Sequence, residues 1–156
     1  MEIYTVSLFV HRRLDSPVQI EKQLEKLTLE LLSSKTYVEF LVGRDGDFDL
    51  LAASVIHRCQ RIFRADNSFI VWVMPYLTAE YRGREESFRE YYNEIEICEE
   101  AAGKHFKAAF QTRNRCMIDR SDLAVFYVRH KSGGAWRTLE YARKRGTPVW
   151  YISPGD

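Results

Sequence analysis

The sequence has no long apolar run, no excess of charge of either sign and no closely spaced cysteines. No segment approaches the roughly 18 consecutive apolar residues that span a bilayer, so we expect no membrane partner. The 23 basic and 22 acidic residues leave a net charge of +1. A chain without an overall positive field is not expected to bind nucleic acids in general.

Cysteine usage indicates a reduced compartment. The three cysteines lie far apart and form no C-x-x-C motif: Cys59, Cys98 and Cys116. An odd number of separated thiols is typical of an intracellular protein, and the first residues show no export signal, so we expect a cytoplasmic protein. Each thiol is interpreted as a small buried hydrophobe. The histidines lack metal-ligand spacing, so no metal site is expected.

Three common motifs of nucleotide-binding and hydrolytic enzymes are also missing. The sequence contains no G-x-x-x-x-G-K-[ST] loop, no G-x-G-x-x-G fingerprint and no G-x-S-x-G elbow. Their absence argues against a P-loop NTPase, a typical dinucleotide dehydrogenase and an α/β-hydrolase.

What the sequence does contain is a regular alternation of strand-like and helix-like segments. Strands are expected at residues 3–9, 37–42, 69–73, 94–97, 123–128 and 149–152. Helices are expected from residue 17, from residue 47, as one exposed helix after residue 76, and at 105–120 and 135–145. This pattern predicts one α/β domain over residues 1–156, Rossmann-like and doubly wound, with helices on both faces of a mostly parallel sheet.

Two glycine-bearing loops follow strands, and ligands of open α/β sheets bind beyond the carboxyl ends of the strands. The loops are Gly43-Arg44-Asp45-Gly46 and Ser132-Gly133-Gly134. Glycine lets the backbone approach a ligand, and the helix that follows offers N–H groups to a phosphate. Either loop alone is more simply a tight strand-to-helix turn, whereas two at one sheet edge favour a ligand site.

A charged side chain on an apolar helix stripe is a more specific signal. Arg113 falls on the apolar side of the expected helix at 105–120, and Asn114 adds a donor and an acceptor beside it. A buried guanidinium is costly unless it pairs with a carboxylate or binds an anion, and the sequence leaves both open. His11 and Arg12 end the first strand, where they are expected to face the same crevice.

Four segments together resemble the SLOG superfamily, the Rossmann-like group that includes DprA and the LOG phosphoribohydrolases, and especially its short YpsA-like branch. They are Phe9-Val10-His11-Arg12, the run 46–53 (GDFDLLAA), the run 113–122 (RNRCMIDRSD) and Ser132-Gly133-Gly134-Ala135-Trp136. The third, with the glycine pair that follows it, is the specific part. The chain departs from the branch at Val10, where glycine is usual, and at Arg44-Asp45, where small residues are usual.

The resemblance implies a crevice that binds a nucleotide or nucleotide-derived ligand, with the chain acting as a sensor or adaptor. The expected ligand-binding residues, including those from the two loops, are His11, Arg12, Gly43, Gly46, Asp49, Arg113, Asn114, Ser132, Gly133 and Gly134. No cofactor is expected beyond such a ligand. Relatives commonly assemble, so a homo-oligomer is a further expectation.

Two alternatives of other classes stay open. The first is a LOG-like phosphoribohydrolase that cleaves the N-glycosidic bond of a nucleoside 5′-monophosphate, with Glu140 and Arg113 as candidate catalytic residues. Against it, the third glycine of the LOG motif is absent and Thr138 lies one place too far from the glycine pair. The second is a protein–protein interaction domain with a vestigial pocket, served by the polar, tyrosine-rich segment 76–104.

Overall fold

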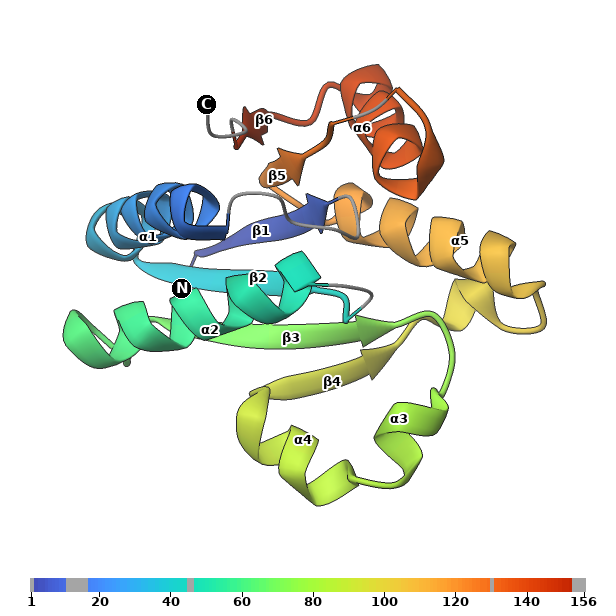
Figure 1. The fold of residues 1–156 in the computed structure, drawn as a ribbon, viewed down its shortest axis with the longest axis horizontal. Helices are drawn as coiled ribbons and strands as arrows, with labels where there is room; N and C mark the ends of the chain where they lie inside the picture. The colour runs from blue at the N-terminus through green and yellow to red at the C-terminus, as the bar shows by residue number, and fades with distance from the viewer. Residues whose placement is uncertain (1, 11–16, 45–46, 130, 153–156) are drawn as a thin grey trace.

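The computed structural model describes residues 2–10, 17–44, 47–129 and 131–152, which form one six-stranded sheet with helices on both faces (Figure 1). The strands are β1 (Ile3–Val10), β2 (Tyr37–Val42), β3 (Ser68–Met74), β4 (Glu94–Ile97), β5 (Leu123–Tyr127) and β6 (Val149–Tyr151). The helices are α1 (Pro17–Ser34), α2 (Asp47–Ile62), α3 (Ala79–Arg82), α4 (Glu85–Tyr91), α5 (Phe106–Asp119) and α6 (Gly133–Arg145), with a 3-10 turn η1 (Glu99–Ala101). None of the described helices is long and apolar enough to cross a membrane.

The sheet has the order β4-β3-β2-β1-β5-β6, and every neighbouring pair is parallel. The chain starts in the middle of the sheet, builds outward to β4, and then crosses back through α5 to β5. Because all strands point the same way, their carboxyl ends meet at one edge. The predicted doubly wound α/β fold is confirmed, and among the described strands the sheet is parallel throughout.

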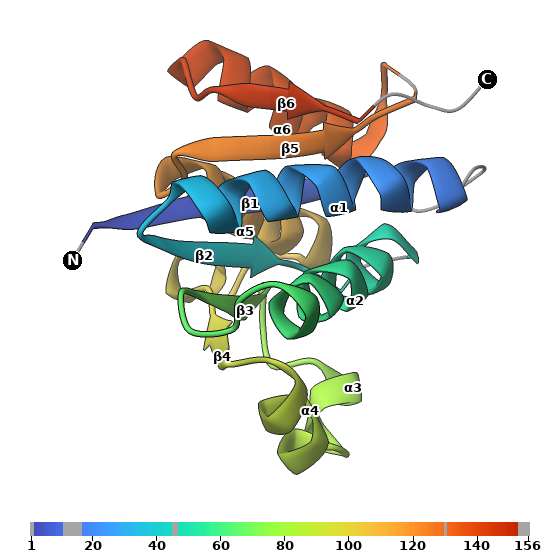
Figure 2. The same cartoon turned by 90° about the vertical axis from the view of Figure 1, so that its left-hand side faces the viewer.

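Residues of each strand alternate between two cores. On β2, Phe40 packs in the core under α1 and α2, whereas the next residue, Leu41, packs in the core under α5 and α6. Side chains along a strand point to opposite faces, so a strand that is apolar at every position is buried on both sides. Figure 2 shows α1 and α2 in front of the sheet, with α5 and α6 behind it.

Helix α1 buries a single apolar stripe. Ile20, Leu24, Leu27 and Leu31 are all buried, at spacings of four, three and four that place them on one side of a helix. Burying such side chains contributes roughly 1.5–3 kcal/mol each before the entropy of ordering them. The helix begins at Pro17, as expected.

The segment after β3 differs from the expected single exposed helix. It forms two short helices, α3 and α4, that meet near Gly83. Tyr81 and Phe88 are buried against Trp72 of β3, with ring centroids 6.0 and 5.0 Å away. The expectation was wrong because the polar residues of this segment mask widely spaced aromatic residues that pack on one tryptophan.

Candidate functional site

Arg113 of α5 lies beneath the carboxyl end of β3. It is only 2% exposed, and its Nη1 donates to the carbonyl oxygen of Val73 at 3.0 Å. Its Nε donates to Oδ1 of Asn114 at 3.0 Å, and its guanidinium lies 5.1 Å from the ring centre of Phe110. The predicted burial of this guanidinium is confirmed. It fastens α5 to the end of a central strand.

The side chain of Asn114 continues this network to the start of α6. Its Nδ2 donates to Oγ1 of Thr138 at 3.1 Å, and the Thr138 hydroxyl donates to the carbonyl oxygen of Gly134 at 2.9 Å. Three predicted site residues, Arg113, Asn114 and Gly134, are therefore connected by side-chain contacts. Thr138 was missed by sequence reasoning, although a threonine four residues after a helix-starting glycine is placed to bond back to it.

The loop before α6 is open to solvent. Ser132, Gly133 and Gly134 are all exposed, and Gly133 has a φ of 88°, in the left-handed region where other residues are strained. Among the described residues, apart from its chain neighbours and the backbone of its own helix, no heavy atom lies within 4 Å of where a Gly133 side chain would begin. The first backbone N–H groups of α6 thus lie at an uncovered surface at the carboxyl edge of the sheet.

The other predicted half of the site lies across the sheet. Gly43 is buried directly after β2, and Asp49 is buried in the first turn of α2, on the face opposite α5. Between them, Arg44 pairs with Glu80 at 2.9 Å and donates to the Tyr92 hydroxyl at 3.1 Å. Burial raises the pKa of Tyr92, and Arg44 opposes that shift. Arg44 is therefore engaged with α3 and the residue after α4.

Four remaining candidates have separate outcomes. His11, Arg12 and Gly46 lie outside the described residues. Glu140 is exposed on α6, beside the buried Leu139 that anchors this helix on the sheet. Its exposure is typical of a solvated helix face.

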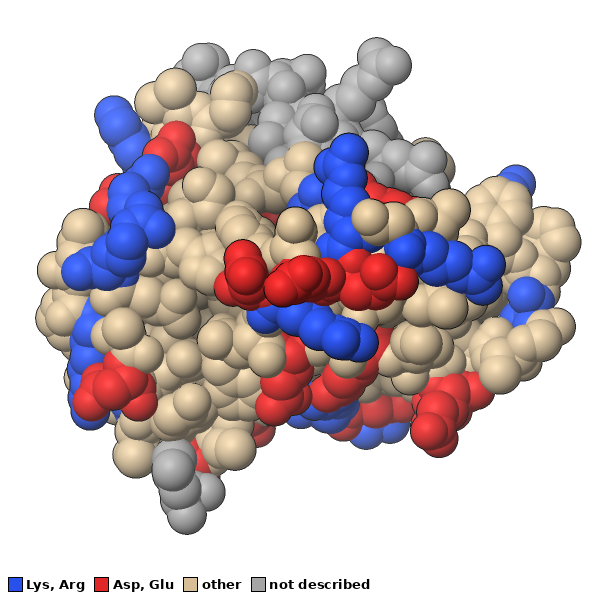
Figure 3. All heavy atoms as spheres, turned by 90° about the horizontal axis from the view of Figure 1, so that it is seen from below, with Lys and Arg blue, Asp and Glu red and all other residues tan. Residues whose placement is uncertain are grey.

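The near-zero net charge conceals a separation of charge along the sheet. Residues 129–145, here named the basic segment, contain six lysines and arginines and one carboxylate. Residues 80–100, the acidic segment, contain eight carboxylates and three arginines. Figure 1 places the helices of these segments, α6 and α3–α4, at opposite ends of the molecule. Figure 3, seen from the α3–α4 side, shows acidic side chains gathered across the middle of that face with basic ones beside them.

Aromatic rings alternate with guanidinium groups along the basic segment and its neighbours. Arg143 lies 5.6 Å from the ring centres of both Trp136 and Tyr151, and it donates to the Tyr151 hydroxyl. On the adjoining side, Arg115 of α5 lies 5.4 Å from the ring of Tyr141. Positive charge beside planar rings is suited to a chain of phosphates and stacked bases. Sequence reasoning missed this surface; the local count of charges in 129–145 would have indicated it.

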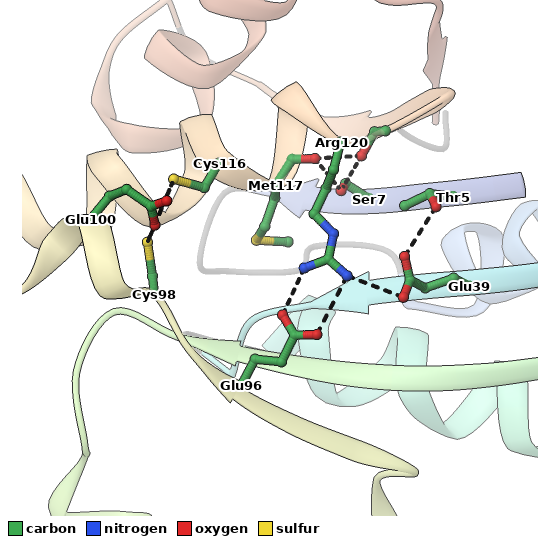
Figure 4. A network of polar contacts seen from close by, with 10 residues as sticks. Thr5, Ser7, Glu39, Glu96, Cys98, Glu100, Cys116, Met117 and Arg120 are labelled. Atoms are coloured by element: carbon green, nitrogen blue, oxygen red, sulfur yellow. Dashed lines mark hydrogen bonds and ion pairs between the residues drawn. The ribbon is translucent and has the colours of Figure 1, made fainter. Parts of the chain in front are cut away.

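A second polar network lies on the same face, nearer the amino ends of the strands (Figure 4). Arg120, at the end of α5, bridges Glu39 of β2 at 3.1 Å and Glu96 of β4 at 2.6 Å. Thr5 of β1 donates to the other oxygen of Glu39 at 3.0 Å. The bond to Glu96 raises the pKa of Arg120. This network joins three strands to α5 and is structural in character.

Comparison with known proteins gives similarity at the level of fold. No family model and no curated protein matches the sequence. Among solved structures, DNA processing protein A of Helicobacter pylori superposes with a TM-score of 0.65 and 20% identity, covering 95% of this chain and 64% of that one. DNA processing protein A (DprA) of Streptococcus pneumoniae superposes with a TM-score of 0.67 and 18% identity, covering 97% of this chain and 51% of that one. The chain thus spans about half to two thirds of these proteins. The Helicobacter pylori structure concerns a unique mode of binding single-stranded DNA.

This comparison corrects the expected function. The similar structures are DNA processing proteins, and the ligand described for one of them is single-stranded DNA, not a small nucleotide. The sensor, phosphoribohydrolase and interaction-domain interpretations are therefore wrong, as is the expectation of no general nucleic-acid binding. That expectation failed because a net charge averages two segments of opposite sign. The chain shares the Rossmann-like α/β fold of these two DprA structures.

Proposed function

We propose that this chain binds single-stranded DNA along the basic segment, where α6 follows β5 at the carboxyl edge of the sheet. The observation that carries the proposal is the composition of residues 129–145, with six basic side chains and one carboxylate in a chain of net charge +1. Phosphate contacts by lysine and arginine supply most of the sequence-independent affinity for nucleic acids. The fold shared with a single-stranded DNA-binding protein supports it.

The aromatic content of the surface favours a single strand over a duplex. Trp136 and Tyr141 are partly exposed, and Tyr151 is exposed at the edge strand β6. Unpaired bases stack on aromatic rings or guanidinium planes, and each stacked base contributes about 1–3 kcal/mol. In a duplex those base faces are already stacked on one another.

The predicted loop residues have a place in this proposal. The backbone N–H groups of Gly133 and Gly134, at the exposed start of α6, are placed to take one phosphate. Arg113 and Asn114 act beneath them as positioning residues, because their hydrogen bonds run through Thr138 to Gly134. Binding then uses a surface ordered before the DNA arrives.

Three finer expectations remain part of the proposal. The runs 113–122 and 132–136 support a place in the YpsA-like branch of the superfamily. The three unpaired thiols support a cytoplasmic location. Assembly into a homo-oligomer stays a prediction, to be checked by light scattering.

The test is fluorescence anisotropy with a labelled thymidine oligonucleotide at several salt concentrations. The variant Lys131→Glu/Arg137→Glu reverses two exposed charges of the basic segment. The matched control, Arg82→Glu/Arg84→Glu, makes the same change of charge in the acidic segment. We expect the first variant to lower affinity at least tenfold. It should also reduce the slope of log affinity against log salt by about 1.4, since each single-strand phosphate contact contributes about 0.7.

Two results would contradict the proposal. One is wild-type protein that gives no saturable anisotropy change at low salt. The other is an equal loss of affinity in both double variants, which would reflect net charge and not a located surface. Competition with thymidine monophosphate separates polymer from monomer binding: millimolar monophosphate is expected to leave the oligonucleotide bound.

A further inference from the structure

A cluster of two thiols and a carboxylate lies at the end of β4, away from the basic segment. Cys98 follows β4, Glu100 lies in η1 and Cys116 lies on α5. The two Sγ atoms are 3.6 Å apart, and Oε2 of Glu100 lies 3.6 Å from the first and 3.7 Å from the second. Figure 4 shows the three side chains converging between η1 and α5.

The three distances match the edges of a tetrahedral metal site. With Zn–S bonds of about 2.3 Å and a Zn–O bond of about 2.1 Å, two sulfur ligands lie about 3.8 Å apart. A sulfur and an oxygen ligand then lie about 3.6 Å apart. The three ligand atoms of Cys98, Glu100 and Cys116 form a triangle of this size, with all atoms within 4.8 Å of one another.

The triangle borders a cavity of about 510 Å³, which is also lined by Glu96, Asp119 and Arg120. Three protein ligands beside an open space are typical of zinc sites that keep a position for water. Two sulfur ligands select a thiophilic cation over Mg²⁺ or Ca²⁺, which prefer oxygen.

We propose that Cys98, Glu100 and Cys116 bind a thiophilic divalent cation, with Zn²⁺ as the natural occupant and water from the adjoining cavity as the fourth ligand. Binding replaces the two thiol protons, which leave to solvent. The cation joins the end of β4 and η1 to α5, beside the small apolar cluster that includes Ala101 and Ala109. In the fold, the bound cation stabilises the contact between segments that are distant in the sequence.

Without a cation, the thiols of Cys98 and Cys116 both donate to Oε2 of Glu100. A coordinating thiol gives up its proton, so metal binding replaces both of these hydrogen bonds. Sequence reasoning missed the cluster, since Cys98 and Cys116 are separated by η1 and most of α5 and do not form a C-x-x-C pair.

The test is metal binding by reduced, chelator-treated protein. We expect one equivalent of Zn²⁺ by mass spectrometry of the desalted protein, and a sulfur-to-metal charge-transfer band when Co²⁺ is added in its place. A hundredfold excess of Zn²⁺ over its dissociation constant should raise the melting temperature by roughly 5–10 °C. Cys116→Ser should abolish the Co²⁺ band, and Glu100→Gln should weaken binding at least tenfold while the band persists.

Cys59→Ser is the matched control, because Cys59 lies on the other face of the sheet and contacts the carbonyl oxygen of Glu25. It should retain stoichiometric metal. The proposal is overturned if reduced wild-type protein binds less than half an equivalent, or if Cys59→Ser loses metal as fully as Cys116→Ser. A further contrary result would be a Cys98–Cys116 disulfide in the purified protein whose reduction does not lead to Zn²⁺ binding. The Lys131→Glu/Arg137→Glu variant should bind metal normally, which separates this proposal from the one on DNA.

Discussion

Asn114 and Thr138 join α5 to α6 through a hydrogen bond of 3.1 Å, and the same threonine hydroxyl donates to the carbonyl oxygen of Gly134. One buried hydroxyl therefore accepts from one helix and donates within the next. Through Arg113, which bonds both Asn114 and the end of β3, the start of α6 is connected to β3.

Replacing this hydroxyl should destabilise the fold. Thr138→Val keeps the shape of the side chain but leaves the Asn114 amide without its acceptor, at a cost of about 1–3 kcal/mol in the free energy of unfolding. Urea denaturation measures it. Thr112→Val is the control, because the Thr112 hydroxyl accepts from Lys104 at the surface and its loss should change stability by less than about 0.5 kcal/mol. An equal loss of stability in both variants would show that the Asn114–Thr138 hydrogen bond does not contribute to stability.

The two glycines that start α6 should respond differently to alanine. Gly133→Ala is expected to destabilise by about 1–2 kcal/mol, since φ of 88° is strained for an L-residue. At Gly134 the new Cβ meets only the amide end of Gln111, at 3.1 Å, and that flexible side chain can move. Helix propensity then offsets the contact, leaving a change near zero. Thermal melts of both variants check this, and a larger loss for Gly134→Ala would contradict it.

Removing Arg120 should cost more than removing an arginine whose carboxylate partner is exposed, because Glu39 is buried. Arg120→Met leaves Glu39, 9% exposed, with Thr5 as its remaining partner in the network of Figure 4, and we expect a loss of about 1–3 kcal/mol. Adding Glu39→Gln should recover part of it, because the uncompensated charge is gone. The control is Arg145→Met, whose pair with Asp119 at 3.1 Å is exposed and contributes at most about 0.5 kcal/mol. Denaturation midpoints of the wild-type protein and the three variants measure these differences in stability.

Stability should fall on mild acidification because of His57. Burial, and to a lesser extent Arg61, lowers the pKa of His57 in the folded protein. The unfolded chain binds that proton first, so the free energy of unfolding falls as the pH drops below the unfolded pKa of about 6.5. We expect a shallower loss between about pH 7.5 and 5.5 in His57→Gln. The control variant is His105→Gln, at an exposed histidine, and a slope shared by all three proteins would exclude His57 as the cause.

Local periodicity was enough to predict most of the fold. The start of α1 and the apolar run of β3 depend on neighbours in the sequence, and both appear as expected. Arg113 was also identified correctly as buried, because a charge on an apolar stripe is visible without a structure. The α3–α4 region was not predicted correctly, since the positions of Tyr81 and Phe88 depend on their packing against Trp72 of β3.

The candidate site was harder to predict because its parts meet only in three dimensions. Thr138 gains its role from Asn114, on a different helix. Cys98 and Cys116 meet because the chain turns back from η1 into α5. The charge of the whole chain predicted the wrong partner class, whereas its distribution along the sheet supports the opposite one.

The separation of charge between the basic and acidic segments makes this nearly neutral molecule an electric dipole. In the electric field of a polyanion a dipole experiences a torque, so the molecule rotates before it contacts the polyanion. The end that carries α6 turns toward the polyanion, and the end that carries α3 and α4 turns away from it. On the proposal that the basic segment binds single-stranded DNA, this orientation raises the fraction of collisions that begin with α6 facing the strand.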